Sequence, residues 1–150
     1  MSGRDDILIR PAGAGERSAL EELQRRASLS LETYREQLEA NPDAIDLPAG
    51  QIERGDVLVA DVEGQVVGFA VVLTDGGKAE LDGLFVEPAL WRRGIGTALV
   101  DAAVHEARRR GLTLMMVVAD PAARKFYERC GFTAEGIAET RFGLALRMSR

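Results

Sequence analysis

The chain has 150 residues, of which 46% are hydrophobic, and it carries a formal net charge of −5. This length suits a single domain over residues 1–150, and the apolar fraction is sufficient for a packed core. The negative charge argues against a nucleic-acid-binding protein, because a phosphate backbone is recognised by a basic face. We expect a soluble protein without membrane contact, since no apolar run approaches the length of a membrane span. The one cysteine, Cys130, points to a reducing compartment and therefore to the cytoplasm.

The first third of the chain predicts one strand followed by helical segments. Residues 7–10 form an apolar run that is typical of a short strand. Residues 16–26 place apolar side chains at helical spacing. A second helix is expected over residues 31–40, and residues 43–54 are expected to form a loop or a broken helix. The second helix has an acidic face made of Glu32, Glu36 and Glu39. That face either is an ordinary solvated surface or attracts a cationic amine substrate.

The middle of the chain predicts an antiparallel meander. Residues 57–62 and 66–73 are two strands joined by a turn at Gly64, and a second turn at Gly76-Gly77 leads into a strand over residues 79–86. The last of these strands ends at Glu87-Pro88, because proline has no N–H to donate and restricts the residue before it.

Gly94 and Gly96 open an amphipathic helix that continues to Arg108, Arg109 and Arg110 and stops at Gly111. We expect the three arginines to be a solvated helix end. Glycines at the start of a helix let an anion approach unpaired backbone N–H groups, so the pattern predicts a phosphate-binding loop. It is not a Walker A loop, and a dinucleotide fingerprint would need glycine or alanine where this chain has Leu99.

The last third predicts a strand over residues 112–119, buried on both faces and parallel to strand 79–86. Asp120 is an N-cap for a short helix that stops at Gly131, and two closing strands follow near residues 133–138 and 142–148. With one histidine and one cysteine, the sequence offers no metal cluster of the usual kind and no Ser-His or Cys-His nucleophile.

Two motifs together resemble the GCN5-related N-acetyltransferase (GNAT) superfamily. The segment Trp91-Arg92-Arg93-Gly94-Ile95-Gly96 is similar to the family's Gln/Arg-x-x-Gly-x-Gly/Ala motif for acyl-CoA, with tryptophan at the first position. The segment that begins at Asp120 is similar to Asn-x-x-Ala-x-x-Phe-Tyr-x-x-x-Gly-Phe, with aspartate in place of asparagine. Short motifs carry false positives, but two at the expected separation are far more specific than one.

The resemblance implies an α/β fold with a mixed, mostly antiparallel sheet and helices on both faces. The implied order is strand, two helices, three strands, helix, strand, helix and two strands. The fourth and fifth strands would run parallel and splay after about Val86, and the pantetheine arm of acetyl-CoA would pair with the free backbone of Leu84 and Val86. The cofactor-binding residues implied in this way are Leu84, Phe85, Val86, Arg92, Arg93, Gly94, Ile95, Gly96, Thr97, Asp120 and Tyr127. Gly96→Val is accordingly expected to abolish CoA binding and to leave the fold intact.

The resemblance also implies direct transfer of an acetyl group from acetyl-CoA to a primary amine, without a metal. Tyr127 matches the family tyrosine that donates to the leaving sulfur, and Glu80 lies where some members carry a glutamate base. Asp82, on the same strand face, is a reserve candidate. Members of the ribosomal-protein type place a glutamate where this chain has Met115, so that arrangement is absent.

Two other interpretations stay open. Because Trp91 and Asp120 depart from the motifs, the chain is alternatively a catalytically silent acetyl-CoA- or CoA-binding regulatory module. A dinucleotide-binding oxidoreductase domain is disfavoured by Leu99. The acceptor, a small-molecule or peptide amine, is not named by the sequence, and a homodimer is one of the assemblies that the family allows.

Overall fold

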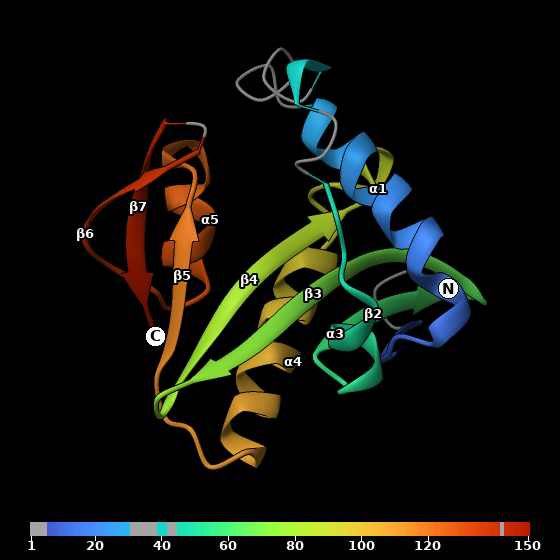
Figure 1. Ribbon diagram of the computed structural model, residues 1–150, viewed down its shortest axis with the longest axis horizontal. Helices are drawn as coiled ribbons and strands as arrows, with labels where there is room; N and C mark the ends of the chain where they lie inside the picture. Colours follow the sequence, from blue (N-terminus) through green and yellow to red (C-terminus); the bar gives the residue numbers. More distant parts are fainter. Residues whose placement is uncertain (1–5, 31–38, 42–44, 142) are drawn as a thin grey trace.

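The computed structural model describes residues 6–30, 39–41, 45–141 and 143–150. A seven-stranded sheet with the order β1-β2-β3-β4-β5-β7-β6 organises the chain (Figure 1). Its strands are β1 (Ile7–Pro11), β2 (Val57–Val62), β3 (Gln65–Asp75), β4 (Lys78–Val86), β5 (Met115–Ala119), β6 (Thr133–Thr140) and β7 (Gly143–Ser149). All neighbouring strands are antiparallel except β4 and β5, which are parallel. The predicted mixed α/β fold with its parallel pair is confirmed.

Two tight turns set the register of the central hairpins. Glu63 and Gly64 both have positive φ between β2 and β3, and Gly76 and Gly77 both have positive φ between β3 and β4. Two-residue loops with this backbone conformation match the right-handed twist of the strands that they join. The predicted meander is therefore fixed locally, by its turn residues.

Helices cover both faces of the sheet. The helix α4 (Ile95–Arg109) packs over one face and buries Leu99, Val100 and Ala103 against side chains of β2 to β5. The helices α1 (Arg17–Leu29) and α3 (Ala49–Glu53) cover the other face, where Leu20, Leu23 and Ile52 contact residues of β2 and β3. The last helix, α5 (Arg124–Arg129), follows a 3-10 turn at Pro121–Ala123. No helix among the described residues is long and apolar enough to span a membrane.

Several helices and strands begin or end at other residues than the sequence predicted. The helix expected over residues 16–26 extends to Leu29, and part of the segment 43–54, expected to be a loop or a broken helix, forms α3. The helix expected over residues 31–40 falls mostly on residues 31–38, which lie outside the described residues. The strand expected over residues 112–119 begins only at Met115, since the preceding residues connect it to the end of α4.

The parallel pair separates earlier than predicted. Backbone pairing between β4 and β5 ends at Leu81 and Val117, whereas the sequence predicted separation after about Val86. The prediction that β5 is buried on both faces is also wrong, because Val118 is 44% exposed where its neighbour strand has diverged. Figure 1 shows the two strands parting from their common end. Half of β4 therefore has a backbone edge that no strand covers.

Candidate active site between the separated strands

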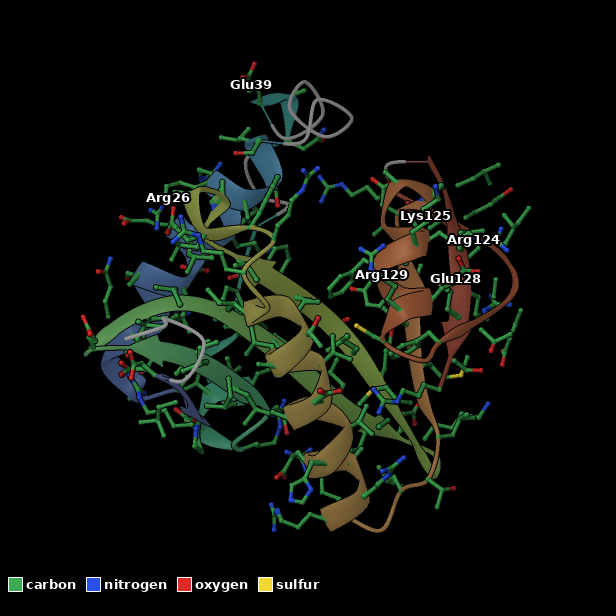
Figure 2. All side chains as sticks on the ribbon, turned by 180° about the vertical axis from the view of Figure 1, so that it is seen from behind. Arg26, Glu39, Arg124, Lys125, Glu128 and Arg129 are labelled. Carbon is green, nitrogen blue, oxygen red and sulfur yellow. The ribbon has the colours of Figure 1, made fainter. Side chains whose placement is uncertain are left out.

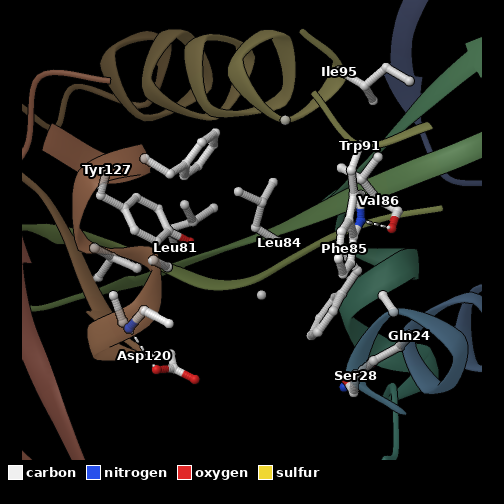
Figure 3. Close-up of a pocket in the computed structure, with 18 of the residues that line it drawn as sticks. Gln24, Ser28, Leu81, Leu84, Phe85, Val86, Trp91, Ile95, Asp120 and Tyr127 are labelled. Atoms are coloured by element: carbon white, nitrogen blue, oxygen red, sulfur yellow. Dashed lines mark hydrogen bonds between the residues drawn. The ribbon is translucent and has the colours of Figure 1, made fainter. Parts of the chain in front are cut away.

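A cavity of about 950 Å³ opens where β4 and β5 have parted (Figure 3). Its walls come from α1, β4, the start of α4, β5, α5 and the β6–β7 hairpin. A volume of this size is typical of small-molecule sites. The predicted site residues that line it are Leu84, Phe85, Val86, Arg92, Gly94, Ile95, Gly96, Thr97, Asp120 and Tyr127. Arg93 and Glu80 are not among the lining residues. The two motifs, which are separated in sequence, thus meet at one cavity.

The glycine loop (residues 92–97) presents unpaired backbone N–H groups to the cavity. Gly94 is the N-cap of α4 and has a left-handed backbone with a φ of 83°, which glycine adopts without steric cost. The first hydrogen bond of the helix runs from the Ala98 N–H to the Gly94 carbonyl at 3.0 Å. The N–H groups of Ile95, Gly96 and Thr97 therefore have no partner within the helix, and the helix dipole favours a negative charge beside them. This geometry suits a phosphate.

Gly96 also has a packing role that the sequence did not indicate. A Cβ atom placed on Gly96 would lie 3.2 Å from Cζ of Phe126, which is tighter than ordinary van der Waals contact. A branched side chain on Gly96 would require the ring of Phe126 to move, so the expectation that Gly96→Val leaves the fold intact stays a prediction, which thermal unfolding of the variant would test. Gly96 lets the helices of the two motifs approach each other closely.

The free edge of β4 is partly occupied by the chain itself. The Glu87 N–H donates to the Val67 carbonyl at 2.8 Å, so this residue directs its backbone groups toward β3. Because alternate residues of a strand direct their backbone groups to opposite sides, the carbonyl of Val86 points to the free side. There it accepts a hydrogen bond of 2.8 Å from Nε1 of Trp91, the dashed line in Figure 3. The family resemblance implied a free Val86 backbone, but in the structure its carbonyl already has this partner.

Tyr127 is buried in the wall formed by α5. Its side chain is 8% exposed, and its ring packs edge-on against Phe126 and Phe132 at centroid distances of 5.1 and 5.5 Å. Burial raises the pKa of the phenol well above its ordinary value, and the neighbouring Cys130 raises the pKa further. The hydroxyl is therefore a neutral O–H donor at physiological pH, and it has no hydrogen-bond partner among the described residues. Buried polar groups are normally paired, so this donor is available to a ligand.

Two carboxylates lie on β4, and they differ in their relation to the cavity. Asp82 lines the cavity, whereas Glu80 belongs to the part of β4 that pairs with β5 and is opposite Met116. Asp82 is the extra residue of a β-bulge, since Val71 pairs with Gly83 and Val72 pairs with Leu81. Bulges re-aim side chains and are over-represented beside active sites.

Both β4 carboxylates have raised pKa values. Loss of solvent around Asp82 raises the pKa of its carboxyl. Glu80 is exposed, as is Asp82, but partial loss of solvent likewise raises the pKa of its carboxyl, and the negative charges of Asp82 and Asp75 raise it further. A carboxylate with a raised pKa is a stronger base than an ordinary one, which is a feature of catalytic sites as well as of crowded surfaces.

The structure confirms the predicted role of Asp120 as an N-cap. Its Oδ1 accepts a hydrogen bond of 2.9 Å from the Ala122 N–H, which caps the turn that leads into α5. Gly131 has a φ of 92° after that helix, as a helix stop requires. The two ends of the second motif therefore place Tyr127 against the cavity.

Other lining residues belong to no motif. Gln24 and Ser28 come from α1 and face the cavity beside Phe85 (Figure 3). Their spacing of four residues puts them on one side of the helix, next to its buried stripe. That spacing is the only signal in the sequence, and many exposed helix faces share it. Thr140 and Arg129 complete the opposite wall.

The helix α5 carries three cations, Arg124, Lys125 and Arg129, and Arg124 lies on the side of the helix that faces away from α1 (Figure 2). Arg124 forms an ion pair with Glu128, whereas Arg129 lines the cavity. Across the cavity, Arg26 of α1 donates two hydrogen bonds to the carboxylate of Glu87, at 2.9 and 2.8 Å, and so ties α1 to the end of β4. Glu39 is exposed, and the other members of the predicted acidic face, Glu32 and Glu36, lie outside the described residues.

Comparisons with known proteins agree with this geometry. A sequence profile described as "Acetyltransferase (GNAT) family" matches residues 19–132. An uncharacterized N-acetyltransferase of Methanocaldococcus jannaschii is 33% identical over 91 residues, which cover 54% of this chain and 40% of the archaeal protein. The 5-NmdU N-acetyltransferase of Pseudomonas phage PaMx11 is 33% identical over 95 residues, which cover 62% of this chain and 68% of the phage protein.

The fold agrees with solved structures over nearly its whole length. The PaiA N-acetyltransferase of Thermoplasma acidophilum, in complex with coenzyme A, superposes with a TM-score of 0.78 at 21% identity, over 96% of this chain and 98% of that one. Identity at this level shows a shared fold. The chain spans only 28% to 51% of the length of four of its curated relatives.

Proposed function

The chain belongs to the acetyltransferase (GNAT) family, and from this premise we propose that it is an N-acyltransferase that moves an acetyl group directly from acetyl-CoA to a primary amine. The observation that carries the proposal is the cavity between β4 and β5, which joins the N-terminus of α4 to a buried, neutral phenol. Acetyl-CoA combines a pyrophosphate, a peptide-like arm and a reactive thioester. The start of α4 would bind the pyrophosphate, the uncovered edge of β4 would pair with the arm, and Tyr127 would lie beside the thioester.

The residues of the cavity fit acetyl-CoA. The unpaired N–H groups of Ile95, Gly96 and Thr97 would hold the pyrophosphate, and Arg92 beside them adds positive charge. The uncovered backbone of Leu84 and Val86 would pair with the arm in the manner of an added strand. When bound, acetyl-CoA supplies the activated acetyl group.

The acceptor amine must lose a proton to react. A lysine amine has a reference pKa of about 10.4 and is protonated at neutral pH. We assign Asp82 as the base, because it lines the cavity at the bulge where β4 and β5 separate and because its pKa is raised. Glu80 lies outside the cavity lining, so a role for it requires a bridging water.

Tyr127 is proposed to stabilise the departing sulfur. A phenol with a raised pKa does not surrender its proton easily to a thiolate, whose reference pKa is about 8.5. A hydrogen bond from the Tyr127 hydroxyl, rather than complete proton transfer, is therefore the expected interaction. The absence of a partner for this buried hydroxyl among the described residues leaves it available for that bond.

Thermal unfolding with four ligands tests the proposal. Acetyl-CoA or CoA at a hundredfold its dissociation constant should add about 2.7 kcal/mol of stability and raise Tm by roughly 5 to 10 °C, whereas NADH and ATP should not. A shift with NADH alone would favour the oxidoreductase interpretation. No shift with either CoA ligand would overturn the proposal.

A second candidate is a CoA-binding regulatory module without catalysis, which is suggested by the departure of Trp91 and Asp120 from the motif residues of the family. A panel of amine acceptors separates the two functions, since a module of this kind would show the CoA-induced shift but no acetylated product. Relatives are named as a 5-NmdU N-acetyltransferase and as mycothiol acetyltransferases, so the panel should span small-molecule as well as peptide amines.

A further inference from the structure

Trp91 is held by two features of the loop that precedes α4. Its backbone N–H donates to the Pro88 carbonyl at 3.3 Å and closes the 3-10 turn Pro88–Leu90. The next residue, Arg92, has a φ of 67°, a left-handed backbone that is uncommon outside glycine. This sharp change of direction sends the chain toward Gly94, while the indole folds back over the end of β4.

The indole lies where a ligand arm along β4 would need backbone partners. Trp91 lines the cavity, is 39% exposed, and donates from Nε1 to the carbonyl of Val86 at 2.8 Å. A carbonyl can accept two hydrogen bonds, but the indole ring also fills part of the space beside the strand edge. The indole of Trp91 and a peptide-like arm would therefore compete for the Val86 carbonyl and for the space beside it.

We propose that Trp91 is a positioning residue whose indole occupies the β4 edge in the free protein and releases the Val86 carbonyl when the pantetheine arm binds. This inference rests on the proposed function, because it assumes that the arm enters beside β4. A single partly exposed hydrogen bond contributes modestly to stability, so an amide N–H of the arm can replace the indole N–H at little net cost. Trp91 then tunes affinity for the arm.

The substitution Trp91→Phe tests the competition, because it keeps an aromatic ring and removes the donor. Affinity for CoA, measured by calorimetry, should become roughly twofold to tenfold tighter, as expected when one competing hydrogen bond is lost. Adenosine 3′,5′-bisphosphate is the control ligand, since it keeps the adenosine and 3′-phosphate of CoA but lacks the arm and the outer phosphate that carries it. Its affinity should not change.

Fluorescence of the unmodified chain gives a second measurement that needs no variant. Trp91 is the only tryptophan in the sequence, so the whole tryptophan signal comes from this position. Saturation with CoA should shift its emission, and saturation with adenosine 3′,5′-bisphosphate should not.

The outcomes separate this inference from the proposed function. If CoA binds but Trp91→Phe leaves its affinity unchanged or weakens it, the indole does not compete and the inference is wrong while the proposed function stands. Equal changes for both ligands, or an emission shift with adenosine 3′,5′-bisphosphate, would also overturn it. If CoA binds to neither form of the protein, the proposed function fails and the inference fails with it.

Discussion

Asp82 and Glu80 lie two residues apart on β4, but only Asp82 lines the cavity. As a base, Asp82 acts in its charged form, so activity should be present above its pKa and should fall as the pH drops through it. Because that pKa is raised, the fall should begin above the ordinary aspartate value of about 3.9. Asp82→Asn should lower kcat/KM by about 10²-fold or more and abolish this acid limb in a pH–rate profile.

Glu80→Gln is the matched control for Asp82→Asn. It removes a carboxylate from the same strand and should retain the acid limb. The charged form of Asp82 is disfavoured by loss of solvent, so Asp82→Asn should not lower Tm at neutral pH. A large loss of activity in Glu80→Gln with a normal rate in Asp82→Asn would reverse the assignment.

Tyr127→Phe isolates the hydroxyl from the ring. Phenylalanine keeps the edge-on contacts with Phe126 and Phe132, so the wall of the cavity should hold. Turnover should fall by about 10²-fold, whereas the dissociation constant of CoA should stay within about twofold. Steady-state kinetics and calorimetry check the two values separately. A normal rate would remove Tyr127 from the mechanism, and a weaker affinity for CoA would make it a binding residue instead.

The sequence predicted some of these site residues better than others. Motif spacing pointed to Tyr127 and Gly94, because each needs a particular residue type at a fixed place in one helix. The family resemblance placed Glu80 before Asp82, because some members carry a glutamate base at that position, and it did not include the bulge at Asp82. A bulge arises from how two strands pair, and a single strand's sequence does not report it.

Helices and strands were predicted correctly where residues next to each other in the sequence determine the backbone conformation. Turns at Gly64 and Gly77 predicted the meander, and Gly94 and Gly111 predicted the bounds of α4, since each has a positive φ in the structure. The point at which β4 and β5 separate was predicted five residues too late. The elements around the separated strands are α1, α5 and the β6–β7 hairpin, which come from distant parts of the chain, and such long-range contacts have no local pattern.

The two ends of α4 serve different purposes in the molecule. Its start lines the cavity, and its end is anchored by Arg110, which was expected to be a solvated residue. Arg110 instead donates to Oδ1 of Asp56 at 3.1 Å, to the Gly55 carbonyl at 3.1 Å and to Glu106 at 2.8 Å. Asp56 is 8% exposed and is the one buried charged residue in the part of the chain that the structure describes. Arg110 therefore joins α4 to the turn before β2.

Because the start of α4 lines the cavity and its end is held by Arg110, we expect that substitutions can change stability and cofactor binding separately. Arg110→Met leaves Asp56 with Arg54 as its remaining ion-pair partner, at 3.1 Å. Loss of a partner for a buried polar group costs about 1–3 kcal/mol, which should lower Tm by roughly 3 to 10 °C in a chain of this length. The dissociation constant of CoA should not change, because Arg110 does not line the cavity.

Arg109→Met is the control for Arg110→Met, because Arg109 is 68% exposed and forms an ion pair with Glu106 alone among the described residues. Exposed ion pairs contribute little to stability because water screens them, so the Tm of Arg109→Met should stay close to that of the parent chain. Equal losses of Tm in the two variants would mean that Asp56 does not depend on Arg110. A weaker affinity for CoA in Arg110→Met would mean that the end of α4 controls the position of the glycine loop, and the two functions of the helix would then be coupled along its length.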